Sequence, residues 1–317
     1  MKIFINTFSD ILTKKHRSKK DWDGVTKGSL WGHRFFIWLI KRSGLSFAYG
    51  FAGVVIGYYI IFSPRTSSMI YRYFRKRHLF SRWKSMRMTY RNYHCFAKIL
   101  IDKTAIPTGM GNKFSYQFEN HDEVTHLLGQ KQGCIFISAH VGNWDVAGHL
   151  FGKHNTHVNI VMLDAEHQRI KKYLESVTGE KSYKIIALKD DMSHTFEIGK
   201  ALINKEYICF QGDRHMKGTT TLNRTFLGAP ASFPAGPFQI AAHAQVPVVF
   251  FFAVRKPGRT YRFCFYIAHV DQNMTKREIT ESLASQYVCS LEQVLRRYPE
   301  QWFNYYEFWD KEQENLS

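Results

Sequence analysis

From about residue 120, short apolar runs alternate with stretches of helical periodicity, and this pattern constrains the fold more than any other feature. The apolar runs predict strands over Cys134–Ser138, Val158–Leu163, Tyr183–Leu188, Tyr207–Phe210, Val246–Val254 and Tyr261–Ile267. The periodic stretches predict helices over 144–151, 166–177, 193–204, 237–245 and 277–298. Near-continuous apolar strands separated by helices are typical of a mostly parallel sheet covered by helices on both faces. We therefore expect one α/β domain over residues 102–317.

Two of the expected strands end in polar residues, and sites in such sheets form beyond the carboxyl ends of strands. His140 follows the first strand, and Asp145 lies five positions later. Gly142 and Asn143 favour a turn between them, with Asn143 as a helix N-cap that we also expect to bind substrate. We expect the turn to bring the Asp145 carboxylate to the imidazole and fix its tautomer. Such a pair can deprotonate an alcohol; the alternative is a purely structural histidine.

The second polar strand end is the run from Gln211 to His215, after the strand at 207–210. We expect Asp213 to fix Arg214 or to bind substrate, and Arg214 to bind substrate; the alternative is an ion pair that stabilises a turn. Farther along, a loop rich in glycine and proline runs from Phe226 to Gly236 and leads into a helix of small residues. Its backbone amides, near Gly236, are expected to hold an anionic or thioester group.

Nucleophile and metal signatures are weak in this chain. It has no Gly-x-Ser-x-Gly elbow, which argues against a serine hydrolase. Ser138, beside His140, is expected to be a hydrogen-bonding residue at the strand end. The five cysteines are far apart and mostly in apolar runs, so they indicate buried thiols of a reducing compartment. We expect no metal site.

The positive charge is concentrated at one end of the chain. Residues 1–101 contain 20 Lys/Arg and 3 Asp/Glu, and no acid occurs from Gly24 to Ile101. Residues 102–317 contain 24 Lys/Arg and 23 Asp/Glu, so almost all of the net charge of +18 lies in the first region. This asymmetry indicates that residues 1–101 contact an anionic surface.

Within the basic region, Leu45–Phe62 is a stretch of 18 residues without a formal charge. As a helix it would be roughly 27 Å long, close to the thickness of a bilayer core. Aromatic residues at its margins and basic flanks on both sides favour a membrane anchor, either spanning or lying in the interface. The alternative is a buried helix of a large domain. We expect residues 1–101 to form a membrane-anchoring helical region.

Residues 79–101 predict an amphipathic helix. Its apolar positions recur at three- and four-residue steps, and Arg82, Lys84, Arg87 and Arg91 fall between them. We expect one face to pack on the domain or the bilayer and the cationic face to meet phosphates. An acidic carrier protein is another partner that this face suits.

These elements, in this order, resemble the lipid A late acyltransferases, the lauroyl/myristoyl family of bacterial inner membranes. The resemblance extends from the basic region to the C-terminus, and its elements are His140-x4-Asp145, Asp213 in a Gly-Asp-Arg turn, the loop ending at Gly236 and the ending Tyr298-Pro-Glu-Gln-Trp302. It implies a glycerol-phosphate-acyltransferase-like fold on the cytoplasmic face of the inner membrane. It also implies transfer of a fatty acyl chain from acyl carrier protein or coenzyme A to a lipid hydroxyl, with no other cofactor, and catalytic roles for His140 and Asp145.

One departure from the family bears on the acceptor. Where the family usually has a basic cluster near its end, this chain has the aromatic run Phe303-Asn-Tyr-Tyr-Glu-Phe-Trp309. The loss of cations argues against a bis-phosphorylated lipid A acceptor and favours an aminolipid or another glycolipid.

Two other classes of function stay open from the residues. A nucleic-acid binder would explain a pI near 9.6, but its cations would not surround an uncharged stretch of this length. A catalytically inactive membrane scaffold is the second alternative, and the presence of His140, Asp145 and Asp213 argues against it. We expect no nucleic-acid partner.

Overall fold

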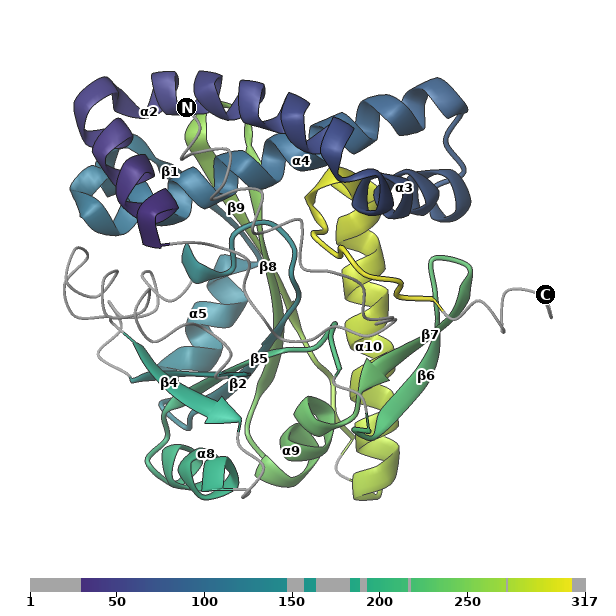
Figure 1. Ribbon diagram of the computed structural model, residues 1–317. Helices are drawn as coiled ribbons and strands as arrows, with labels where there is room; N and C mark the ends of the chain where they lie inside the picture. The colour runs from purple at the N-terminus through teal and green to yellow at the C-terminus, as the bar shows by residue number, and fades with distance from the viewer. Residues whose placement is uncertain are drawn as a thin grey trace.

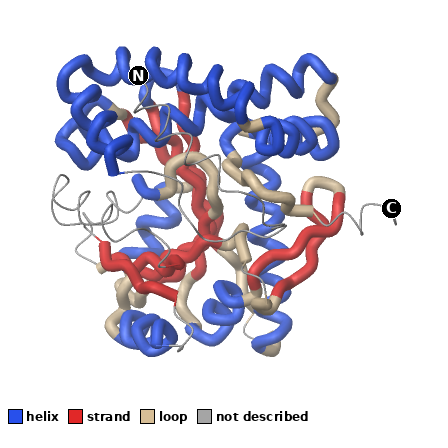
Figure 2. Tube along the Cα trace, in the orientation of Figure 1, coloured by secondary structure: helices blue, strands red, loops and turns tan. Residues whose placement is uncertain are grey.

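The computed structural model describes residues 30–146, 157–163, 183–188, 193–215, 218–271 and 273–309. A seven-stranded sheet with the order β1-β9-β8-β2-β5-β3-β4 lies at the centre of the molecule (Figures 1 and 2). Its strands are β1 (Ser115–Glu119), β2 (Cys134–Ser138), β3 (Val158–Leu163), β4 (Tyr183–Leu188), β5 (Tyr207–Gln211), β8 (Val248–Lys256) and β9 (Thr260–Ile267). Neighbouring strands are parallel except β8 and β9, which are antiparallel. The expectation of a mostly parallel sheet is confirmed.

Helices cover both faces of this sheet. The helices α5 (His121–Gly129) and α10 (Lys276–Arg297) lie on opposite sides of β8 and β9 in Figure 1. Side chains along β8 alternate between two cores: Phe250 and Phe252 pack in one with Tyr287 of α10, and Phe251 packs in the other. This alternation follows from the two-residue period of a strand. It explains why β8 is apolar at nearly every position.

The expected elements are largely present. Strands β2, β3 and β4 have the expected bounds, and β5, β8 and β9 differ from the expected bounds by at most two residues. The helices α8 (Ser193–Ile203), α9 (Gly236–Ala244) and α10 match three of the expected helices. Only the start of the helix expected over 144–151 lies within the described residues, and the one over 166–177 lies outside them. β1 and α5 were not expected.

The segment expected as a loop before Gly236 is mostly a β-hairpin. The strands β6 (Thr221–Phe226) and β7 (Ala229–Pro234) pair antiparallel, with Phe226 opposite Ala229. The two turn residues, Leu227 and Gly228, both have positive φ, at 48° and 79°. This is the conformation that tight hairpin turns need for the twist of their strands. The prediction was wrong because proline is tolerated in a two-stranded ribbon, where every strand is an edge.

A layer of helices from the N-terminal half lies across one end of the sheet (Figure 1). It consists of α2 (Leu30–Phe62, kinked at Gly44), α3 (Pro64–Arg72), η1 (Tyr73–Arg77) and α4 (Arg82–Ala105). The short helical turns η2 (Ile106–Met110), η3 (Gly111–Lys113), η5 (Pro257–Arg259) and η6 (Pro299–Gln301) connect other elements.

The apolar stretch at 45–62 forms the second half of α2. Its residues Leu45, Ala48 and Ala52 are buried in the same core as Phe251 of β8, while Val54 is 73% exposed. One side of the helix therefore packs on the domain, as in the alternative reading of this segment. Among the residues described, we find no helix with the length and apolar character that a crossing of the bilayer requires. The expected transmembrane helix is thus not supported.

Candidate active site

His140 and Asp213 are brought together by two neighbouring strands. β2 and β5 are parallel with Ser138 opposite Gln211, so each of the two residues lies two positions beyond its strand at the same sheet edge. Nδ1 of His140 is 2.8 Å from Oδ1 of Asp213, and the His140 backbone N–H donates to Oδ2 at 3.0 Å. Asp213 is 1% exposed and the His140 side chain 22%. The pair is fixed on its carboxylate side and reaches solvent on its imidazole side.

The charges around this pair define the tautomer of His140. Burial opposes ionisation of Asp213, yet the charge of His140, which is protonated at the low pH where this carboxyl titrates, lowers the pKa of Asp213 to about 2, together with the hydrogen bonds from His140 and the Arg214 guanidinium. An ionised carboxylate only accepts hydrogen bonds, so Nδ1 of His140 carries the proton and Nε2 carries a lone pair. Nε2 has no hydrogen-bond partner among the described residues.

The imidazole is neutral in the resting protein. Burial, followed by the charges of Arg214 and Lys103, lowers the pKa of His140, and the Asp213 carboxylate only partly opposes this shift. A neutral imidazole with a free Nε2 lone pair is the form that accepts a proton. The geometry therefore suits a general base that becomes an imidazolium beside a buried carboxylate.

Asp145 is not the partner of His140, contrary to expectation. Its carboxylate forms an ion pair with Lys103 of α4, and within the described part of the chain no hydrogen bond joins it to His140. The reason lies in the backbone between them. Val141 pairs antiparallel with Trp302, and Gly142 forms a parallel bridge with Ala253. This extended pairing prevents the tight turn that was expected to bring the two side chains together. A catalytic role for Asp145 stays a prediction.

Gly142 is required by a close approach of two backbones. It has a φ of +60°, and a Cβ at this position would lie 2.0 Å from the carbonyl oxygen of Ala253. The next residue, Asn143, donates its backbone N–H to the same carbonyl at 2.8 Å. The Asn143 side chain is buried and donates to the Tyr261 hydroxyl at 3.3 Å. Its amide thus holds the loop, and its expected contact with substrate stays a prediction.

A buried carboxylate on α4 ties the helical layer to this loop. Asp102 is fully buried, and its Oδ2 accepts from the Tyr261 hydroxyl at 2.5 Å and from Nε of Arg255 at 2.7 Å. Its Oδ1 accepts from Tyr49 of α2. Because Tyr261 also bonds Asn143, one network joins α2, α4, β8, β9 and the His140 loop. We did not expect this role, although Asp102 is the first acid after the acid-free stretch that ends at Ile101.

The other predicted site residues differ in how they relate to His140. Ser138 is buried and its hydroxyl donates to the Phe251 carbonyl at 2.7 Å, so its expected hydrogen-bonding role is confirmed. Arg214 donates to the Phe303 carbonyl at 2.9 Å. Gly236 is the first residue of α9, and none of the hydrogen bonds of the described residues joins it to His140. The substrate roles expected of Arg214 and Gly236 stay predictions.

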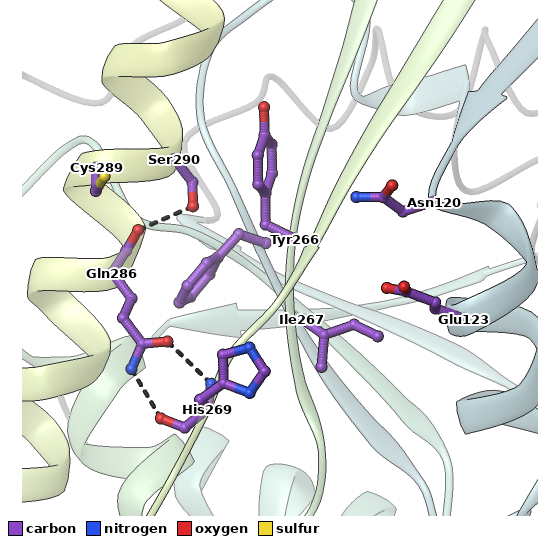
Figure 3. Close-up of a pocket in the computed structure, with 9 residues that line it drawn as sticks. Asn120, Glu123, Tyr266, Ile267, His269, Gln286, Cys289 and Ser290 are labelled. Carbon is purple, nitrogen blue, oxygen red and sulfur yellow. Dashed lines mark hydrogen bonds between the residues drawn. The ribbon is translucent and has the colours of Figure 1, made fainter.

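A hollow of about 390 Å³ lies elsewhere, between α5 and α10 (Figure 3). Its lining includes Glu123, Tyr266 and Cys289, and none of the predicted site residues. On one side, the Gln286 side chain forms two hydrogen bonds with the His269 backbone: its Oε1 accepts from the N–H, and its Nε2 donates to the carbonyl. The hollow is therefore separate from the site around His140.

Comparison with known proteins agrees with the resemblance noted in the sequence. The profile of a family described as "Bacterial lipid A biosynthesis acyltransferase" matches residues 81–310. The chain is also 25% identical over 189 residues to the phosphatidylinositol mannoside acyltransferase of Mycobacterium tuberculosis, in both the H37Rv and the CDC 1551 strains. Each match covers 57% of this chain and 56% of the relative, so the chain spans about half the length of the curated relatives it matches. The family match includes His140, Asp145, Asp213 and Trp302, and the chain belongs to the bacterial lipid A biosynthesis acyltransferase family.

Proposed function

We propose that this protein transfers a fatty acyl chain from a thioester donor to a hydroxyl group of a membrane glycolipid. The observation that carries the proposal is the imidazole of His140, whose Nδ1 is 2.8 Å from Asp213, whose side chain is 22% exposed and whose Nε2 has no hydrogen-bond partner among the described residues. Membership of the acyltransferase family supports the reaction class. The donor is acyl carrier protein or coenzyme A carrying the acyl chain.

In the proposed reaction, Nε2 of His140 takes the proton of the acceptor hydroxyl as its oxygen attacks the thioester carbonyl carbon. The tetrahedral intermediate then collapses, the carbon–sulfur bond breaks, and the leaving thiolate receives the proton from the imidazolium. Asp213 stabilises the imidazolium while it exists, as the carboxylate does in a catalytic triad. General-base assistance of this kind contributes typically about 10² to 10⁴-fold. Arg214 supplies the nearby positive charge that suits the oxyanion.

A mixed apolar and cationic stripe on the outer helical layer supports action at a membrane surface. Leu79, just before α4, and Trp83 and Met86 on it are 83%, 81% and 56% exposed. Trp83 and Met86 lie three residues apart on α4, so they share one side of the helix. Exposed cations accompany them at Arg82, Lys84, Arg87 and Arg91. Apolar side chains entering the interface beside cations that meet anionic headgroups are typical of a helix lying in the membrane plane.

The acceptor is proposed to be a glycolipid or aminolipid with few phosphates. The mycobacterial relative is a phosphatidylinositol mannoside acyltransferase, which makes a glycosylated lipid a suitable class. The aromatic run after Trp302 is used for packing: Phe308 and Trp309 contact Phe226 of the hairpin, and Arg77 lies over the Trp309 ring at 4.5 Å. This segment therefore supplies no cation cluster for two phosphates. We place the protein at the cytoplasmic face of a bacterial inner membrane.

Acyl transfer by purified protein tests the catalytic proposal. The assay follows a labelled acyl chain from its thioester to extracted bacterial lipids by mass spectrometry, and the ester that appears names the acceptor. His140→Ala protein is expected to lose about 10²-fold or more in rate. His126→Ala is the matched control, because His126 is exposed on α5 and is expected to keep the wild-type rate. Transfer by His140→Ala protein at near the wild-type rate would remove the general-base role.

Vesicle binding tests the membrane proposal. Trp83→Ser is expected to lower affinity for anionic vesicles about tenfold or more, because burial of a large apolar side chain is worth about 2 kcal/mol. Phe196→Ser is the control, since Phe196 is 83% exposed but lies on α8, at the other end of the molecule from α4 (Figure 1). Equal losses from the two changes, or binding to RNA that vesicles do not displace, would contradict the membrane surface and favour the nucleic-acid alternative.

A further inference from the structure

The Asp213 carboxylate has a third donor that comes from the end of the chain. Nε1 of Trp302 donates to Oδ2 of Asp213 at 3.1 Å. The same oxygen accepts the backbone N–H of His140, and the other oxygen accepts Nδ1 of its ring. Trp302 is 3% exposed. Each oxygen of the carboxylate therefore has a defined partner, and the indole N–H takes part in setting which oxygen faces the imidazole.

The backbone around Trp302 is attached to the loop that carries His140. Gly142 donates to the carbonyl of Gln301 at 2.9 Å, and Phe303 donates to the carbonyl of His140 at 3.0 Å. Together with the isolated antiparallel bridge between Val141 and Trp302, these bonds hold residues 301–303 against residues 140–142. Trp302 and His140, which both bind the Asp213 carboxylate, are therefore held in place by the same paired backbone segments.

Aromatic packing fixes the plane of the indole. The centroid of the Trp302 ring lies 5.0 Å from that of Phe308, 5.3 Å from that of Tyr73 and 5.5 Å from that of Phe226, and each pair of rings packs edge to face. Rings packed on several sides leave a side chain one orientation. The N–H is therefore aimed at Asp213 by the fold and not by the hydrogen bond alone.

We propose that Trp302 is a positioning residue of the reaction, which holds the Asp213 carboxylate so that Oδ1 meets Nδ1 of His140 and Nε2 stays the basic nitrogen. This inference rests on the proposed function. Trp302 acts through Asp213 and touches neither substrate nor the reacting atoms. In the sequence it stood out only as part of the ending Tyr298–Trp302 that carries the family resemblance.

Loss of the indole N–H has two consequences for the pair. The carboxylate is freer to rotate, so fewer molecules hold Nδ1 correctly. The carboxylate also shares its negative charge with one donor fewer, so it stabilises the imidazolium more strongly and the pKa of His140 rises. The other charged groups that act on the imidazole are Arg214 and Lys103, and a change at Trp302 leaves both in place.

The test compares two tryptophans of the same aromatic cluster. Trp302→Phe removes the donor to Asp213, whereas Trp309→Phe removes a donor that bonds the Phe226 carbonyl at 3.2 Å. We expect Trp302→Phe to lower kcat about 5- to 50-fold with KM changed less than twofold, and to move the acidic limb of the kcat profile to higher pH by half a unit or more. Trp309→Phe should leave both the limb and kcat within twofold of the wild type.

A second readout does not depend on substrate. The ¹⁵N chemical shifts of the His140 imidazole, followed as a function of pH, give its tautomer and its pKa in each protein. If Trp302→Phe fails to fold, benzothienylalanine at position 302 keeps the ring shape and removes only the N–H. A His140 titration and rate unchanged by the loss of the N–H, or equal shifts from the Trp309 variant, would overturn the inference. Wild-type protein without acyl transfer would refute the proposed function, and the titration would still decide the role of Trp302.

Discussion

Replacement of Asp213 by asparagine changes the charge of the site while keeping its shape, and its effect can be worked out from the structure. Asp213 is 1% exposed and accepts two hydrogen bonds from His140. Removing one partner of a buried charged pair costs about 3 to 5 kcal/mol. His140 is neutral at rest and becomes an imidazolium only during the reaction, so the loss falls on kcat. At about 1.36 kcal/mol for each factor of ten, Asp213→Asn should lower kcat about 10² to 10⁴-fold.

Asp145→Asn is the companion variant, because Asp145 is the acid that the sequence paired with His140. Asp145 is also mostly buried, but its partner is Lys103, whose side chain is 43% exposed. A pair of this kind contributes about 1 kcal/mol of stability at most, so Asp145→Asn should unfold at nearly the wild-type temperature, and a large fall in its kcat would support the catalytic role expected of Asp145. The assay is steady-state acyl transfer with thermal unfolding recorded for each variant. If Asp213→Asn kept more than a tenth of the wild-type kcat, the assignment of Asp213 as the partner of His140 would be refuted.

Three further outcomes follow from the same geometry. Arg214→Gln should raise the pKa of His140 by removing a nearby positive charge, so the acidic limb of kcat/KM should move to higher pH. A limb that does not move would contradict the assignment of Arg214 as a cause of the lowered His140 pKa. Gly142→Ala should lower the unfolding temperature far more than Gly228→Ala. Both positions have positive φ, but only a Cβ at position 142 would collide with a backbone oxygen. Equal losses of unfolding temperature would exclude that collision. The lowered pKa of Asp213, about 2 against an ordinary 3.8, contributes about 2 kcal/mol of stability that is present above pH 4 and lost as the pH falls toward 2. Wild type and Asp213→Asn should therefore differ in acid unfolding over that range, and parallel curves would contradict it.

The sequence predicted the central strands well because they are buried on both faces. β2 and β5 are short apolar runs, and such runs stand out from their polar surroundings. β1 was missed because its side chains are partly exposed along its whole length. The β6–β7 hairpin was missed because the two prolines of β7 and the glycine of the turn suggested a loop.

The sequence singled out His140 and Asp213 but did not show that the two side chains meet. His140 and Asp213 were both recognised at strand ends, yet the sequence does not state that β2 and β5 are neighbours with Ser138 opposite Gln211. The nearer acid, Asp145, was preferred because local spacing is all that one sequence displays. Partners such as Trp302, which lies 89 positions from Asp213, depend on the folded chain and leave no local pattern.

The protonation of the His140 ring nitrogens in the resting protein decides directly whether Nε2 is the base of the reaction. Protein labelled with ¹⁵N in its histidines, with His140 assigned by comparison with His140→Ala protein, gives separate shifts for the two nitrogens. At pH 7 to 8 we expect a protonated Nδ1 hydrogen-bonded to a carboxylate and an unprotonated Nε2. A protonated Nε2, or a charged ring at that pH, would contradict the claim that this nitrogen is the base.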